Sequence, residues 1–293
     1  MKLLITGAGG QLGQDCVQLM LDRHEICALT SRQLDITQAE AVREAVACIR
    51  PQVLINCAAY TAVDACETET ERCMVVNAHG PAHLAAACAE FGSRLIHIST
   101  DYVFDGSKPV PQAYTEEDAV GPVSAYGRSK LAGEQAIAER LDDYLILRTA
   151  WLYGMGSGNF LKTMLRLAVA KRPLRVVDDQ HGSLTWTASL ARQIEQVLDG
   201  GLCGIAHATA EGHCTWFEGA KHFLEAMQVE FSLEPCVTAD YPTPARRPAN
   251  SILANHRLQA HGLNVMRDWR ADVDDFVRLH REELLRREHA GFK

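Results

Sequence analysis

Short apolar runs alternate with longer helical patterns along the first half of this chain. The runs have the length of strands, and the stretches between them repeat apolar residues at helical spacing. Near-continuous apolar strands joined by helices predict a parallel sheet that is covered on both faces. The predicted strands are Leu3–Thr6, Ile26–Leu29, Val53–Cys57, Leu95–Ile98 and Leu145–Leu147, and the predicted helices are Leu12–Leu21, Ala39–Ile49, Arg72–Phe91 and Ala125–Arg140.

The first predicted strand runs directly into a glycine-rich turn, which opens a helix. Glycines let the backbone approach a pyrophosphate at the helix N-terminus, where N–H groups and the helix dipole favour an anion. The spacing G-x-x-G-x-x-G is also compatible with a turn that binds nothing, but its place between strand and helix favours a dinucleotide. The predicted contacts are Gly7, Gly10, Gln11, Leu12 and Gly13.

The end of the second predicted strand indicates which dinucleotide is preferred. An NAD site places an acidic side chain there for the ribose 2′-hydroxyl. Here the chain reads Thr30-Ser31-Arg32, and a guanidinium suits a 2′-phosphate, so the sequence favours NADPH, with NADH as the alternative. Arg32 as a solvated surface charge is the other interpretation. Asp35 either accepts from the adenine amino group or is a turn residue before a capping box formed by Thr37 and Glu40.

A tyrosine and a lysine are spaced for one face of a helix. Ser124 is placed to cap that helix, so Tyr126 and Lys130 should lie one turn apart. A tyrosine that donates a proton near neutral pH needs its pKa lowered, and a neighbouring ammonium lowers it by favouring the phenolate. The spacing Y-x-x-x-K is common by chance, and an ordinary exposed pair is the alternative.

A threonine upstream supports a catalytic role for this tyrosine and lysine. Thr100 closes the fourth predicted strand, and open α/β sheets bind ligands at the carboxyl ends of their strands. Its hydroxyl can bond a substrate carbonyl oxygen as negative charge develops there. The glycine turn, Thr100, Tyr126 and Lys130 together predict a dehydrogenase site, active or ancestral.

The pattern loosens after Arg148, where glycines and prolines interrupt the helical stretches. We therefore predict a dinucleotide-binding domain over 1–150 and a smaller, mostly helical substrate-binding lobe over 151–293. A helix near Thr187–Leu198 and a strand at Ile205–Ala208 are expected to return to the first domain, so that about 187–208 belongs to it.

Composition excludes several classes of protein. A net charge of -8 and a sequence pI of about 5.8 argue against a nucleic-acid partner. No stretch has the apolar length of a membrane span. The ten cysteines form no C-x-x-C pair, which leaves zinc knuckles and thioredoxin-like motifs unsupported. We expect a cytoplasmic protein with reduced thiols.

On these motifs the sequence resembles the extended short-chain dehydrogenases and, within them, the dTDP-4-dehydrorhamnose reductase family, over nearly the whole chain. The segments that carry the resemblance are Asn56–Asp64, Ser99–Gly106, Tyr126–Lys130, Arg148–Gly154, Asn159-Phe160, Asp179–Ser183 and Tyr241–Pro248. The resemblance implies a Rossmann-like, doubly wound parallel sheet with a smaller C-terminal lobe. It also implies a homodimer and NADPH-dependent reduction of the 4-keto group of dTDP-4-dehydro-L-rhamnose to dTDP-L-rhamnose, with Tyr126 as proton donor.

The resemblance also implies roles for single residues. Arg247 would face the nucleotide end of a nucleotide-sugar substrate, and Lys130 would grip the nicotinamide ribose. For Trp151 a place in the pocket is favoured over a core aromatic. The implied cofactor contacts are Ile36, Cys57, Ala58, Ala59, Tyr60, Asn77 and Ser99 beside Tyr126 and Lys130, and the implied sugar contacts are Thr61, Val63, Thr100, Asp101 and Trp151.

Some residues depart from relatives with other properties. Nucleotide-sugar dehydratases have Asp-Glu after the strand-end threonine, whereas this chain has Asp101-Tyr102, which fits simple reduction. Some members of the family bridge a dimer with magnesium held by glutamates; here the positions read Asp15 and an acid-free Thr185–Ser189, so we expect no required metal. Ala150 and Cys57 replace the usual serine and alanine.

Two other functions stay open at this point. One is a cofactor-binding regulatory subunit without turnover, as in the beta subunit of methionine adenosyltransferase, which has the same fold. The other is a reductase of another nucleotide-linked deoxy-ketosugar.

Overall fold

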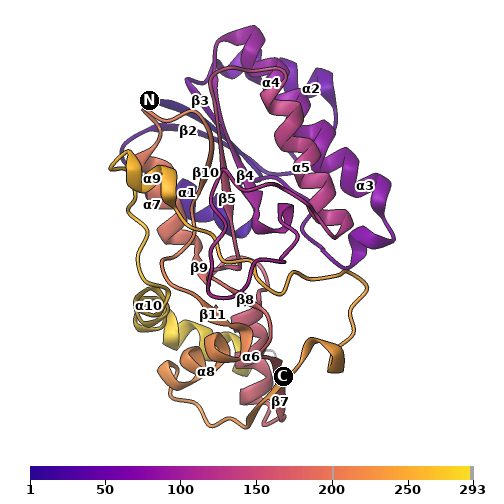
Figure 1. Ribbon diagram of the computed structural model, residues 1–293. Coiled ribbons are helices and arrows are strands. Elements are labelled where there is room, and N and C mark those ends of the chain that lie inside the picture. The colour runs from indigo at the N-terminus through magenta and orange to yellow at the C-terminus, as the bar shows by residue number, and fades with distance from the viewer. Residues whose placement is uncertain (200, 291–293) are drawn as a thin grey trace.

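The computed structural model describes residues 1–199 and 201–290, and a parallel sheet forms its larger part (Figure 1). Within these residues six strands lie in the order β10-β5-β4-β3-β1-β2. The order reverses direction between β1 and β3, the point at which open α/β sheets bind ligands. The doubly wound sheet predicted from the sequence is confirmed. Its strands are β1 (Lys2–Thr6), β2 (Glu25–Leu29), β3 (Val53–Asn56), β4 (Arg94–Thr100), β5 (Tyr144–Thr149) and β10 (Gly204–His207).

Helices cover both faces of the sheet (Figure 1). On one face α1 (Gln11–Met20) and α7 (Thr187–Gln196) pack together over the apolar side chains of β1, β3 and β5. On the other face α2 (Ala39–Ile49), α4 (Gly80–Phe91) and α5 (Ala125–Ala138) bury a second cluster. Burial on both faces is the reason that the strands are apolar at nearly every position.

The helix predicted over Arg72–Phe91 is present as a continuous helical run, but its α-helical hydrogen bonding is interrupted. It is divided into α3 (Thr70–Met74), a π-helical turn at Val75–His79 and α4. Pro81 explains the break, because it has no N–H for the carbonyl of Asn77 and its ring crowds that carbonyl. The turn places Asn77 beside the loop that follows β3, where its side chain bonds the backbone N–H and carbonyl of Tyr60 at 2.8 and 2.9 Å.

The two predicted helix caps have different outcomes. Ser124 does cap α5, since its hydroxyl accepts from the N–H of Gly127 at 3.1 Å. The capping box of Thr37 and Glu40 is wrong, because α2 begins after Gln38 and has no side-chain cap. The Thr37 hydroxyl instead donates to the carboxylate of Asp35 at 2.8 Å, a local turn that competes with capping.

The rest of the chain forms a smaller lobe with its own apolar core, below the sheet in Figure 1. Helix α7 and strand β10 return to the sheet, and α9 (His256–Ala260) packs beside β10. The division at 150 stays a prediction; Gly200 in the returning segment and residues 291–293 lie outside the described residues. The lobe contains α6 (Phe160–Val169), α8 (Trp216–Ala226), α10 (Trp269–Ala290), β6 (Leu152–Tyr153), β7 (Leu174–Val177), β8 (His181–Gly182), β9 (Thr185–Trp186), β11 (Cys214–Thr215) and β12 (Leu233–Cys236). None of the helices in the described part of the chain has the length and apolar content that crossing a membrane requires.

Candidate active site

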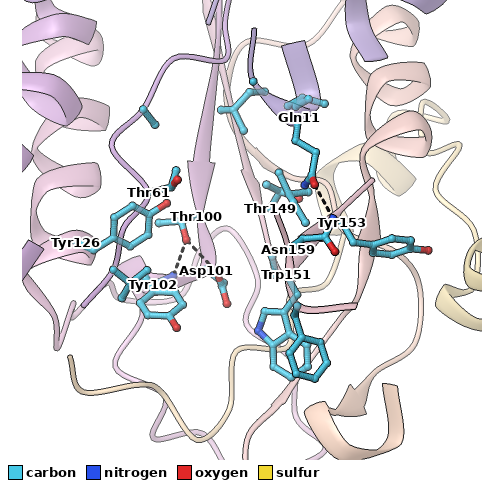
Figure 2. Close-up of a pocket in the computed structure, with 18 of the residues that line it drawn as sticks. Gln11, Thr61, Thr100, Asp101, Tyr102, Tyr126, Thr149, Trp151, Tyr153 and Asn159 are labelled. Carbon is cyan, nitrogen blue, oxygen red and sulfur yellow. Dashed lines mark hydrogen bonds between the residues drawn. The ribbon is translucent and has the colours of Figure 1, made fainter. Parts of the chain in front are cut away.

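A cavity of about 460 Å³ opens at the carboxyl ends of β1, β3, β4 and β5, between the sheet and the lobe. Figure 2 shows Thr100 and Tyr126 on one side of it and Gln11, Thr149 and Trp151 on the other. Fourteen of the residues predicted from the sequence line this cavity: Gly10, Gln11, Leu12, Cys57, Ala59, Thr61, Val63, Ser99, Thr100, Asp101, Tyr126, Lys130, Trp151 and Arg247.

The other predicted contacts do not line it. Gly7, Gly13, Ala58, Tyr60 and Asn77 lie behind the wall of the cavity and shape its backbone. Arg32 and Asp35 are exposed on the loop after β2, and Ile36 is buried beneath it. Contact of these residues with a cofactor stays a prediction.

The glycine turn is packed too tightly for any other residue at two positions. Gly7 has φ +67°, and a Cβ there would lie 2.5 Å from the backbone nitrogen of Ala58. A Cβ at Gly13 would collide with the carbonyl oxygen of Gly7. No side chain caps α1, whose N-cap is Gly10, so the first N–H groups of the helix face the cavity without a side-chain acceptor in the described part of the chain. This arrangement fits the pyrophosphate of a dinucleotide.

The catalytic pair predicted on α5 is brought to the cavity but not into mutual contact. Tyr126 is 8% exposed and Lys130 is 1% exposed. Burial raises the pKa of Tyr126, contrary to the lowering that the sequence predicts. The reason is the direction of Lys130, whose Nζ donates to the carbonyl oxygen of Ile98 at 2.7 Å and contacts Nε2 of His97 at 3.1 Å.

Thr100 and Asp101 form a short polar edge at the end of β4. The Thr100 hydroxyl donates to Oδ1 of Asp101 at 2.9 Å and accepts from the N–H of Tyr102 at 3.2 Å. Burial raises the pKa of Asp101 to about 6. Within the described residues, its Oδ2 and the hydroxyl of Thr149 are buried without a hydrogen-bond partner. Buried polar atoms are normally paired, so both atoms suit a bound polar ligand.

The substrate side of the cavity is aromatic. Trp151 and Trp216 stack with ring centroids 3.6 Å apart, and Phe160 meets Trp216 edge-on at 4.5 Å. Trp151 lines the cavity and also packs against the apolar core of the lobe. Trp216 was not predicted from the sequence, although it begins a helix marked by a capping box of Thr215 and Glu218.

Arg247 lies where this cavity meets a second one of about 650 Å³. Its guanidinium donates to Oδ2 of Asp64 at 2.9 Å and to the hydroxyl of Tyr102 at 3.2 Å. The two cavities share Phe160, Trp216 and Arg247, so one elongated ligand can occupy both. Asp64 and Tyr102 fell inside segments singled out in the sequence, but their pairing with Arg247 was not predicted.

No cluster of His, Cys, Asp and Glu side chains suited to a metal ion occurs among residues 1–199 and 201–290. The carboxylate of Asp15 accepts from the hydroxyl of Thr187, and burial raises its pKa. That no metal is required stays a prediction.

A glycine-rich turn after β1, a strand-end threonine and a Tyr/Lys pair on one helix define the class of short-chain dehydrogenases on a Rossmann-like sheet. The family profile described as "RmlD substrate binding domain" matches residues 1–281. The chain is 45% identical to dTDP-4-dehydrorhamnose reductase of Mycolicibacterium smegmatis, covering 94% of this chain and 85% of the relative. It therefore belongs to the dTDP-4-dehydrorhamnose reductase family.

Two further comparisons concern the ligands of relatives. The chain is 39% identical to dTDP-4-keto-6-deoxy-D-glucose reductase of Streptomyces niveus, over 92% of this chain and 93% of that protein. The crystal structure of dTDP-4-dehydrorhamnose reductase from Bacillus anthracis in complex with NADP aligns with a TM-score of 0.91 and 38% identity, over 94% of this chain and 98% of that one.

Proposed function

We propose that this chain reduces the 4-keto group of dTDP-4-dehydro-L-rhamnose to dTDP-L-rhamnose with NADPH. The observation that carries the proposal is the meeting of Thr100, Tyr126 and Lys130 in one cavity beside the glycine turn. The family of the chain and the NADP complex of a relative support it.

On the cofactor side, the N-terminus of α1 would hold the pyrophosphate and Lys130 the nicotinamide ribose. Cys57 and Ala59 form the wall between them. Arg32 is exposed at the far end of this path, where a 2′-phosphate would lie. NADPH when bound supplies the hydride to the carbon of the ketone.

On the substrate side, Tyr126 gives its proton to the ketone oxygen. The raised pKa of Tyr126 keeps the phenol protonated, and the alkoxide that hydride addition leaves is more basic than a phenolate, so the transfer remains favourable. The hydroxyl of Thr100 turns from Asp101 to the same oxygen. The ammonium of Lys130 stabilises the phenolate that remains.

The sugar would lie among Thr61, Val63, Asp101 and Trp151, with the unpaired Oδ2 of Asp101 accepting from a sugar hydroxyl. The nucleotide end would pass Arg247 into the second cavity. Arg247 would then contact the nucleotide end of the substrate, the role that the resemblance implies.

The experiment is loss of NADPH absorbance with freshly generated dTDP-4-dehydrorhamnose, for wild type, Tyr126→Phe and Lys130→Met. We expect turnover by the wild type, and at least an ~100-fold loss in Tyr126→Phe with NADPH affinity kept. Wild-type turnover by Tyr126→Phe would refute the proton-donor role. NADPH binding without any wild-type turnover would favour the regulatory subunit instead.

A second substrate is supported by the Streptomyces niveus relative, which reduces a different dTDP-linked ketosugar by its name. Comparing kcat/KM on both sugars, and on a GDP-linked ketosugar, decides between them. Higher kcat/KM on dTDP-4-keto-6-deoxy-D-glucose would replace the rhamnose assignment and leave the roles of Thr100 and Tyr126 intact.

We further propose a cytoplasmic homodimer. The ten cysteines are all free thiols, which suits a reducing compartment. Light scattering of the purified protein tests the dimer, and a monomer at working concentration would exclude it.

A further inference from the structure

Four buried polar side chains form a continuous chain beneath the cavity, from the middle of the sheet to α5. They are Thr6 on β1, Asn56 on β3, His97 on β4 and Lys130 on α5, and each is at most 1% exposed. The Thr6 hydroxyl donates to Oδ1 of Asn56 at 2.7 Å, Nδ2 of Asn56 lies 2.9 Å from Nδ1 of His97, and Nε2 of His97 lies 3.1 Å from Nζ of Lys130.

The direction of the Asn56 amide is fixed by a backbone group. The N–H of Ala58 can only donate, and it donates to Oδ1 of Asn56 at 3.0 Å. The other end of the amide, Nδ2, therefore points at His97. An amide nitrogen has hydrogens and no acceptor capacity, so Nδ1 of His97 must accept.

The protonation of His97 follows. Nδ1 has no proton, and burial holds the pKa of His97 well below its usual range. A neutral imidazole without a proton on Nδ1 has it on Nε2. The Nε2–H then faces Nζ of Lys130.

An ammonium has three donors and no acceptor, so it would oppose the Nε2–H donor to donor. A neutral amine accepts from Nε2–H with its lone pair and still donates to the carbonyl oxygen of Ile98. We propose that His97, oriented by Asn56, is a positioning residue that favours the neutral amine of Lys130 over the ammonium. The proposal deepens the role of Lys130 and so rests on the proposed function.

The charged and titratable groups around Lys130 favour its ammonium form. Glu134 on the same helix, Cys73 on α3 and Cys57 after β3 all favour the ammonium, and Glu134 is itself paired with Arg148 at 2.7 Å. Burial outweighs them and lowers the pKa of Lys130 to about 8. On the side of His97 the charged neighbour is Lys130 itself.

The protonation state of Lys130 should set the pH dependence of turnover. If the ammonium is the form that stabilises the phenolate of Tyr126, kcat/KM falls as pH rises through the pKa of Lys130. A hydrogen bond that favours the neutral amine brings that fall to a lower pH. Lys130 can then gain or lose its proton close to neutral pH, which an ordinary lysine cannot.

The first measurement needs no substrate. Imidazole 15N NMR of the wild type, with the His97 signal assigned by its loss in His97→Gln, reports which ring nitrogen has the proton. We expect Nε2–H with a bare Nδ1 throughout the neutral range, and a Lys130 titration near 8 in 13C-lysine spectra. A proton on Nδ1, or a Lys130 midpoint at the ordinary value of about 10.4, overturns the proposal.

Asn56→Asp is the variant that should move the His97 proton from Nε2 to Nδ1. Its carboxylate can accept from Nδ1–H, which frees Nε2 to accept from the Lys130 ammonium. We expect the proton on Nδ1, a Lys130 midpoint raised by about one pH unit, and an alkaline limb of kcat/KM raised equally. The added charge acts in the same direction, so an unchanged tautomer overturns the proposal even if the midpoint rises.

The matched control is Asn255→Asp. Asn255 is likewise 1% exposed and accepts from a backbone N–H, that of Thr209 at 2.9 Å. It should leave the His97 tautomer and the Lys130 midpoint unchanged. Because the NMR measurements require no turnover, failure of the reductase assignment would leave them intact, whereas failure of the His97 assignment would appear in them whether or not the protein turns over.

Discussion

The two sides of the cavity are built in different ways. The cofactor side consists of backbone and buried hydrogen bonds, in which Gly7 touches the loop after β3 and His97 reaches Lys130 through the sheet. The substrate side consists of side chains from separate elements of the sheet domain and the lobe, among them the stacked rings of Trp151 and Trp216. A backbone contact has little freedom to adjust, whereas a stacked side chain can be exchanged at modest cost. Substitutions on the cofactor side should therefore abolish function, whereas substitutions on the substrate side should only reduce it.

The glycine turn gives the largest expected effect. Gly7 and Gly92 have similar left-handed backbones, with φ of +67° and +71°, but only Gly7 has backbone atoms where a Cβ would lie. Gly7→Ala should lower the free energy of unfolding by about 3 kcal/mol and remove NADPH binding, whereas Gly92→Ala should cost only about 1 kcal/mol. Denaturant unfolding and NADPH fluorescence measure both; equal losses in the two variants would show that the close approach has no energetic weight.

Thr100 gives the next largest effect, on the rate alone. Thr100→Val removes the hydroxyl proposed to bind the ketone oxygen, and kcat should fall about 100-fold with unchanged affinity for NADPH. Because that hydroxyl also accepts from the N–H of Tyr102, Thr100→Ser serves as the control and should restore most of the rate. A loss of rate that serine does not restore would assign Thr100 to packing.

Asp101 should lower the free energy of unfolding at neutral pH. Its folded pKa of about 6 lies above the ordinary value, so the native state favours the protonated form, and stability is lost as pH rises through about 6. Asp101→Asn should therefore raise the free energy of unfolding at pH 7 by about 2 kcal/mol and by much less near pH 4. Unfolding curves at the two pH values test it, and an equal gain at both would assign the effect to packing.

The same contrast explains what the sequence could predict. Gly10, Thr100 and Tyr126 follow directly from a strand end or a capped helix, so local patterns placed them. The capping box at Thr37 failed because the Thr37 hydroxyl bonds the Asp35 carboxylate instead of capping the helix. Pro81 interrupts the α-helical hydrogen bonding of the helix predicted through it, which continues to Phe91.

On the lobe side, position depends on contacts far apart in the chain. Arg247 meets Asp64 across 183 residues, and Trp216 at the start of α8 meets Trp151 between β5 and β6. No spacing in the sequence encodes these pairs. The role of Arg247 came from resemblance, and that of Trp151 from resemblance together with its position just past the fifth strand. The contact of Lys130 with His97 was not predicted, because His97 reads as one more residue of a buried strand.

The smallest expected effect is on the aromatic wall and tests the contrast directly. Trp216→Leu keeps an apolar side chain but removes the stack, so the KM for the nucleotide sugar should rise about tenfold with kcat and NADPH affinity nearly unchanged. Trp186→Leu is the matched control, because Trp186 packs on Phe276 in the core of the lobe and lines neither cavity. It should lower stability without a specific rise in KM. If Trp216→Leu instead abolished NADPH binding, the two sides of the cavity would be one cooperative unit, and the distinction between a backbone-built and a side-chain-built half would fail.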